Sequence, residues 1–142
     1  MITAIDTNVV LDVVTADAKH GLASADAMRR AASEGSLIAC EIVWAELAAA
    51  FGPGPQAETT LRRLGIVFSA VEQPEAVAAG TAWRNYRNRG GPRERLIGDF
   101  LVGAHALGKA DRLLTRDRGF YRLCFSGLTV MDPARLQAVN RG

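Results

Sequence analysis

Short apolar runs alternate with longer stretches of helical periodicity along this chain of 142 residues. The apolar runs predict strands, near residues 2–5, 37–40, 66–69, 112–115 and 128–131. The periodic stretches predict helices, near residues 8–14, 20–34, 42–51, 56–63, 74–88, 96–108 and 118–123. Strands that alternate with helices are typical of a parallel sheet covered by helices on both faces. The pattern therefore predicts an α/β fold with a central, mostly parallel sheet of four to five strands.

The breaks between the predicted elements are short. Residues 52–55 and 88–92 are rich in glycine and proline, and we expect both to be loops. The sequence contains no internal repeat, low-complexity tract or domain linker. Its length suits one domain, residues 1–142, that can bury a sizeable core.

Composition narrows the class of protein further. Hydrophobic residues make up 49% of the chain, as in ordinary globular domains, and no apolar run approaches the roughly 18 residues of a membrane span. The N-terminus begins with a strand pattern and has no basic segment, so we expect no signal peptide. Cys40 and Cys124 are the only cysteines, which suggests no disulfide framework and a reducing, cytoplasmic location.

Two acids follow predicted strands. Asp6 closes the strand at 2–5, and Asp117 lies two residues beyond Thr115, at the end of the strand at 112–115. Ligands of open α/β sheets bind beyond the carboxyl ends of the strands. We therefore expect both acids at the same edge of the sheet. Each has a structural alternative as a turn or helix-cap residue.

Two further acids interrupt apolar helices. Val43, Glu46, Leu47 and Ala50 fall on one helical face, so Glu46 is predicted to lie within an apolar stripe. Asp99 is the only acid in a helix that is apolar nearly all round, which describes a buried helix. A charge among core residues is costly unless it is paired, neutralised or bound to metal. Glu46 could pair with an arginine at the edge of the core; all four acids could instead share one hard divalent cation.

In this order and spacing, the acids resemble the motifs of the PIN-domain ribonucleases, and most closely those of the VapC toxins of toxin–antitoxin pairs. The resemblance runs from Met1 to about Leu128, and its motifs are Asp6-Thr7-Asn8, Glu46 in an apolar helix, Asp99 in Asp-Phe-Leu-Val-Gly-Ala-His-Ala, and Thr115-Arg116-Asp117-Arg118-Gly119-Phe120. It implies a PIN-like three-layer fold, hydrolysis of RNA, inhibition by a VapB-type antitoxin, and a homodimer. Candidate residues for the dimer interface, or alternatively for the core, are Trp44, Phe51, Trp83 and Tyr86.

Carboxylates alone favour Mg²⁺ or Mn²⁺ over Zn²⁺, which prefers nitrogen and sulfur ligands. The expected metal ligands and catalytic residues are Asp6, Glu46, Asp99 and Asp117. The resemblance implies that Asn8 lies close to the metal site and helps to orient it, although asparagine is also a common cap or turn residue. Thr115 is either an ordinary strand threonine or a further residue that supports the ligands. With water as the nucleophile, the products would carry 5′-phosphate and 3′-hydroxyl ends.

Arginine greatly outnumbers lysine, although the net charge is only +2. Arginine forks suit phosphate geometry, and phosphate contacts position a nucleic acid without reading its bases. The candidates for RNA contact are Arg84, Arg87, Arg116 and Arg118. A solvated helix face explains the same charge run, and both interpretations stay open here.

Other residues are expected to be structural. A set of acids looks solvated: Asp12, Asp17, Asp26 and Glu41. His105 faces away from Asp99 on its helix, so a histidine base is not supported. A phosphohydrolase with an Asp-x-Asp motif would need a second acid where Asn8 stands. The non-enzymatic alternative is a degenerate PIN-like domain that binds RNA or protein without catalysis.

Overall fold

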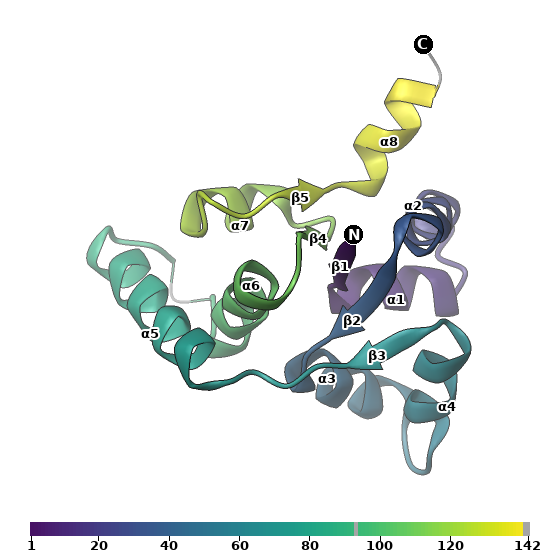
Figure 1. The fold of residues 1–142 in the computed structure, drawn as a ribbon, viewed down its shortest axis with the longest axis horizontal. Helices are drawn as coiled ribbons and strands as arrows, with labels where there is room; N and C mark the ends of the chain where they lie inside the picture. Colours follow the sequence, from purple (N-terminus) through teal and green to yellow (C-terminus); the bar gives the residue numbers. More distant parts are fainter. Residues whose placement is uncertain (93, 141–142) are drawn as a thin grey trace.

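The computed structural model describes residues 1–92 and 94–140. Its strands form one sheet: β1 (Ile2–Ile5), β2 (Ser36–Ala39), β3 (Ile66–Phe68), β4 (Arg112–Leu114) and β5 (Val130–Met131). Every neighbouring pair is parallel, and the spatial order is β3-β2-β1-β4-β5. The chain therefore starts at the centre of the sheet, builds one half, and then crosses to build the other (Figure 1).

The helices lie between the strands: α1 (Thr7–Val14), α2 (Gly21–Glu34), α3 (Glu41–Phe51), α4 (Gln56–Arg63), α5 (Gln73–Asn88), α6 (Ile97–Lys109), α7 (Arg118–Cys124) and α8 (Pro133–Asn140). Right-handed crossovers between parallel strands place α1 to α4 on one face of the sheet and α5 to α7 on the other. Figure 1 shows these two groups on opposite sides of β1 and β2. The prediction of a three-layer α/β fold with a parallel sheet is confirmed.

The core lies on both faces of the two central strands. Ile5, Leu113 and Leu114 are almost completely buried, because β1 and β4 have helices above and below. On one face, Val9 and Val10 of α1 pack beneath the sheet. Strands buried on both faces need apolar residues at successive positions, which explains the uninterrupted apolar runs in the sequence.

Aromatic side chains fill the opposite layer, between α5, α6 and α7. Tyr86 and Phe120 each pack edge-to-face on Phe100, with ring centroids 5.5 and 5.3 Å apart. Tyr86 is only 6% exposed, so this interface candidate belongs to the core. Trp44 and Phe51, like Trp83, are partly buried against the same core.

Helix α8 is absent from the sequence prediction. Pro133 occupies its first position, and Asp132 Oδ1 accepts a hydrogen bond from the backbone N–H of Ala134 at 3.0 Å. The dipeptide Asp132-Pro133 is a typical helix start and could have indicated α8. Its apolar residues show little periodicity, which is why the pattern did not reveal it. Among the described residues, no helix has both the length and the apolar character to cross a membrane.

Candidate active site

Asp6 stands at the carboxyl end of β1 and caps the N-terminus of α1. It is 8% exposed. Oδ1 accepts a hydrogen bond from the backbone N–H of Thr7 at 2.8 Å. Oδ2 accepts one from the Thr115 hydroxyl at 2.8 Å and one from Asn8 Nδ2 at 3.3 Å. All three donors are neutral, so the carboxylate is well oriented but its charge is not compensated.

The electrostatics of Asp6 reflect that environment. Burial raises its pKa to about 6, against the lowering effect of the hydrogen bonds from Thr115 and Thr7, and the charge of Glu46 raises it further. In the part of the chain that the structure describes, no Lys, Arg or His nitrogen lies within 4.0 Å of the carboxylates of Asp6, Glu46 or Asp99. A buried carboxylate without a cationic partner is destabilised in its charged form.

Glu46 reaches the same edge of the sheet from α3. Its Oε1 accepts a hydrogen bond from the Thr7 hydroxyl at 3.1 Å, so it is joined to the residue that follows Asp6. The expectation that Glu46 lies within an apolar stripe is wrong in one respect: Val43 and Leu47 are buried, but Glu46 and Ala50 are exposed. The carboxylate sits at the edge of the stripe, where water and a ligand can reach it.

Asp99 occupies the first turn of α6 and is partly exposed. Its Oδ2 accepts a hydrogen bond from the backbone N–H of Leu96 at 3.3 Å. The expectation of an acid inside a buried helix is therefore corrected, because the burial begins one residue later at Phe100. A helix N-terminus favours a carboxylate, which lowers the cost of holding the Asp99 charge at this position.

Asp117 follows β4 as predicted, but it has a cationic partner. Both of its oxygens face Arg95, with 3.2 Å between Oδ1 and Nη2 and a closer contact between Oδ2 and Nη1. The hydrogen bond with Asp117 raises the pKa of Arg95, whose guanidinium also lies over the Phe120 ring. Sequence reasoning did not single out Arg95, since nothing local links it to a residue 22 positions later.

Thr115 joins the two strand-end acids. It is fully buried; its hydroxyl donates to Asp6 and accepts from the backbone N–H of Asp117 at 3.0 Å and from Asn8 Nδ2 at 3.3 Å. Asn8 Oδ1 accepts from the backbone N–H of Arg116 at 3.2 Å. The structure therefore places Asn8 and Thr115 directly against Asp6.

Tyr121 of α7 is a further member of the site that sequence reasoning missed. It is 2% exposed, and burial together with the charges of Asp6, Asp99 and Asp117 raises the pKa of its hydroxyl. The phenol therefore stays protonated among these acids and can serve as a donor. An aromatic residue in a short apolar helix reads as core, and no local signal marks it as part of a site.

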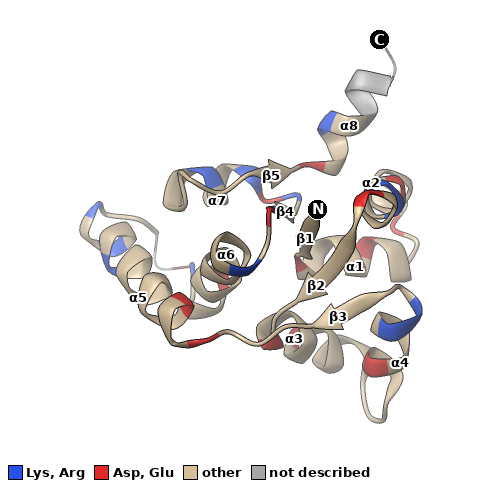
Figure 2. Cartoon of the chain, in the orientation of Figure 1, with Lys and Arg blue, Asp and Glu red and all other residues tan. Residues whose placement is uncertain are grey.

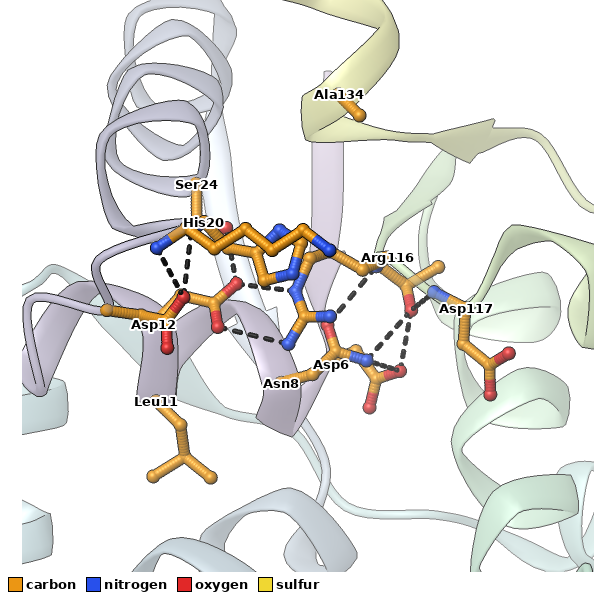
Figure 3. A network of polar contacts seen from close by, with 12 residues as sticks. Asp6, Asn8, Leu11, Asp12, His20, Ser24, Arg116, Asp117 and Ala134 are labelled. Carbon is orange, nitrogen blue, oxygen red and sulfur yellow. Dashed lines mark hydrogen bonds and ion pairs between the residues drawn. The ribbon is translucent and has the colours of Figure 1, made fainter.

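Two expectations about solvated acids are wrong. Asp12 is 4% exposed and forms an ion pair with Arg116, Oδ2 to Nε at 2.6 Å and Oδ1 to Nη2 at 3.0 Å (Figure 3). Arg116 was a candidate for RNA contact, but its guanidinium is directed at Asp12. Glu41 is partly buried, and its Oε1 accepts a hydrogen bond from the backbone N–H of Val71 at 2.8 Å.

The donor set suits a hard cation, although it is not gathered into a finished metal site. Within residues 1–92 and 94–140, no three His, Cys, Asp or Glu side chains stand close enough together to hold an ion. The carboxylate oxygens of Asp6 and Glu46 nevertheless flank Thr7 without a cationic partner in this region. Oxygen-only donors of this kind match Mg²⁺ or Mn²⁺.

Fold and site together define a three-layer α/β domain with acids at the carboxyl edge of a parallel sheet. The PIN domain family matches residues 3–126, and the chain belongs to that family. A search of curated proteins gave no match.

Solved structures that share the fold include two VapBC complexes and a further toxin–antitoxin complex. VapBC2 from Rickettsia felis, bound to a promoter DNA fragment, is 19% identical with a TM-score of 0.71 and covers 93% of this chain and 98% of its own. VapBC-1 from nontypeable Haemophilus influenzae is 21% identical with a TM-score of 0.68 and covers 94% and 99%. A toxin–antitoxin complex from Klebsiella pneumoniae is 18% identical with a TM-score of 0.64 and covers 92% and 97%.

Proposed function

We propose that this PIN domain is a metal-dependent endoribonuclease of the VapC type, the toxin of a type II toxin–antitoxin pair. The observation that carries the proposal is the buried Asp6 carboxylate, whose three donors are all neutral. Glu46 is joined to the neighbouring residue, because its Oε1 accepts a hydrogen bond from the Thr7 hydroxyl. The charges of Asp99 and Asp117, like that of Asp6, raise the pKa of the buried Tyr121 hydroxyl. A buried carboxylate without a cationic partner destabilises the fold, and a cation bound at Asp6 would offset that cost.

Asp6, Glu46 and Asp99 would hold Mg²⁺ or Mn²⁺, with Asp117 at the rim. When bound, the ion supplies Lewis-acid stabilisation of the phosphate and a more acidic water. Thr115 and Asn8 keep both Asp6 oxygens in a fixed direction. Hydrolysis by water leaves 5′-phosphate and 3′-hydroxyl ends.

Basic residues would guide the RNA to this edge. Figure 2 shows Lys and Arg positions on both α5 and α7. Arg84 and Arg87 are exposed on α5, and the Arg87 guanidinium lies 4.5 Å from the centre of the Trp83 ring. Arg118 opens α7 beside Asp117 and is half-buried. These three remain the phosphate contacts that we propose, whereas the pairing of Arg116 favours a structural role.

The nuclease activity is tested with purified protein and a long single-stranded RNA. We expect cleavage with Mg²⁺ or Mn²⁺, none with EDTA, and products that a ligase requiring 5′-phosphate accepts. Asp99→Asn should lose cleavage, and Asp26→Asn, on the exposed face of α2, should keep it. Cleavage that persists in EDTA would contradict the metal requirement.

The toxin assignment is supported by the shared fold with VapBC complexes and a complex described as toxin–antitoxin. The partner would be a VapB-type antitoxin, and the two free cysteines suit the cytoplasm. Induced expression of the wild type should arrest a bacterial host, and Asp99→Asn should not. Equal arrest by both proteins would show that toxicity does not come from this site.

We also propose a homodimer. Partly buried Trp44, Phe51 and Trp83 remain available for such an interface, while Tyr86 does not. Light scattering at micromolar concentration should give about twice the monomer mass of 15.2 kDa. A mass equal to the monomer would contradict the dimer.

One observation favours a second candidate, a PIN-like scaffold without catalysis. Asp99 is bonded to the start of its own helix, and Asp117 is bonded to Arg95. If these contacts persist in solution, fewer acids are free for a metal. Calorimetry that detects no Mn²⁺ binding to folded protein would support the scaffold.

A further inference from the structure

We propose that Asp12 and Arg116 are positioning residues that fix the Asp6 carboxylate through Asn8. The inference rests on the proposed metal-dependent function. It gives a role to an ion pair whose side chains, within the described chain, form no hydrogen bond or ion pair with Asp6, Glu46, Asp99 or Asp117.

The side chains of Asp12 and Arg116 bind each other. Both Asp12 oxygens bind the Arg116 guanidinium, at 2.6 and 3.0 Å, and Oδ2 also accepts the Ser24 hydroxyl at 2.7 Å. Asp12 is 4% exposed. An acid saturated in this way has no free oxygen directed at a metal, and a guanidinium held by two contacts is not directed at a phosphate.

Arg116 acts at two points of one helix. Its guanidinium holds Asp12, and its backbone N–H donates to Asn8 Oδ1 at 3.2 Å. Asn8 and Asp12 are four residues apart in α1 and therefore lie on the same face. Figure 3 shows Arg116 lying across this face, beside Asp6. The residue after Thr115 is thus fixed to α1 through both its side chain and its backbone.

That attachment decides which way the Asn8 amide points. Because Oδ1 accepts from Arg116, the Nδ2 group must face Asp6 Oδ2 and the Thr115 hydroxyl, each at 3.3 Å. The reversed amide would set its carbonyl oxygen against the Asp6 carboxylate and lose a donor. Partners of metal-binding carboxylates that orient them in this way strongly affect metal affinity.

The chain offers a matched control in a second arginine pair. Arg112 Nη2 lies 3.1 Å from Glu34 Oε2, and the Arg112 side chain is 13% exposed. Arg112 also donates to Thr3 on β1, but within the described chain it forms no hydrogen bond or ion pair with Asn8 or Asp6. Glu34→Gln therefore removes an acid from an arginine pair without touching the proposed connection.

The test measures Mn²⁺ binding by calorimetry at pH 7.5 on wild type, Asp12→Asn, Arg116→Gln, the double variant and Glu34→Gln. We expect each single change to weaken Mn²⁺ binding about 10- to 100-fold, since the role resembles that of groups behind metal ligands. The double variant should be no weaker than the single ones, and Arg116→Lys should recover part of the affinity. Glu34→Gln should bind Mn²⁺ like the wild type.

A second measurement requires no metal, so it can also be made on variants whose stability is low. In metal-free wild type, NMR should show the Asn8 side-chain NH₂ protected from solvent exchange. Asp12→Asn should increase that exchange, and Glu34→Gln should not. This readout separates a positioning role from a general loss of stability.

Three results would overturn the proposal. Wild-type Mn²⁺ affinity in Asp12→Asn would remove the positioning role, and so would unchanged exchange of the Asn8 amide. A raised KM for RNA in Arg116→Gln alone, with unchanged Mn²⁺ affinity, would assign Arg116 to RNA instead. Failure of the wild type to bind Mn²⁺ would contradict the proposed function, and the Asn8 measurement would still decide the inference.

Discussion

Asp6 caps the N-terminus of α1, and Asp12 lies six residues later within that helix. Both side chains are buried. They are 8% and 4% exposed. Asp12 has a guanidinium on both oxygens, whereas Asp6 has only neutral donors. Of two buried acids, the one whose charge has no cationic partner is therefore the better candidate for a functional role.

The physical reason is the cost of an uncompensated charge. A buried carboxylate beside a guanidinium is neutralised within the protein itself, so it serves structure. Asp6 must either hold a proton, which its raised pKa of about 6 reflects, or bind a cation from outside. We therefore propose that Asp6 receives a cation, whereas the Asp12–Arg116 pair attaches the segment after β4 to α1.

The largest expected difference is in catalysis. Asp6→Asn should reduce RNA cleavage by more than about 100-fold, since even the groups behind a metal ligand are worth about 10- to 100-fold. The protein should remain folded by circular dichroism. Asp12→Asn should lose less activity, because it acts on Asp6 only through Asn8. Equal losses in the two variants would remove the distinction between the two acids.

Breaking the Asp12 pair should have the larger effect on stability. Arg116→Gln leaves Asp12 buried without its cation, and we expect a loss of about 3 kcal/mol in the free energy of unfolding, the lower end for buried pairs because Arg116 is partly exposed. Urea denaturation measures it. Arg62→Gln, which breaks the exposed pair with Glu58, should change the same quantity by less than about 1 kcal/mol.

Asp6 should instead make metal-free stability depend on pH. The folded chain holds this proton up to a pKa of about 6, but the unfolded chain releases it near 3.8. The contribution is fully present below pH 3.8 and is lost as the pH rises through 6. From pH 4 to 7 in EDTA, the wild type should lose up to about 2.5 kcal/mol relative to Asp6→Asn, at 1.36 kcal/mol per pKa unit. Parallel stability curves for the two proteins would contradict a raised pKa.

The smallest effect is expected at Asp117. Its charge is already matched by Arg95, and its side chain is 34% exposed. Asp117→Asn should lower kcat about tenfold, equal to about 1.4 kcal/mol of activation free energy. Rapid-quench cleavage assays beside Asp6→Asn provide the comparison. A loss as large as that of Asp6→Asn would place Asp117 among the principal metal ligands.

The sequence predicted the parallel sheet and the placement of Asp6 and Asp117 at one of its edges, because both acids follow strands whose carboxyl ends meet there. It did not predict the Asp12–Arg116 pair, whose members are 104 residues apart. That contact depends on the register of β1 with β4, which no local pattern specifies. The predicted burial of Glu46 was also wrong. Helical spacing shows which residues share a face of a helix, but it does not show how much of that face the neighbouring elements cover.

Anomalous diffraction from crystals grown with Mn²⁺ is the sharpest test of a metal site at Asp6, because it locates the ion without reference to activity. We predict an anomalous peak bonded to Asp6 and to at least one of Glu46 and Asp99, with no peak at Asp12. Crystals without a peak at saturating Mn²⁺, or with one only away from Asp6, would contradict it.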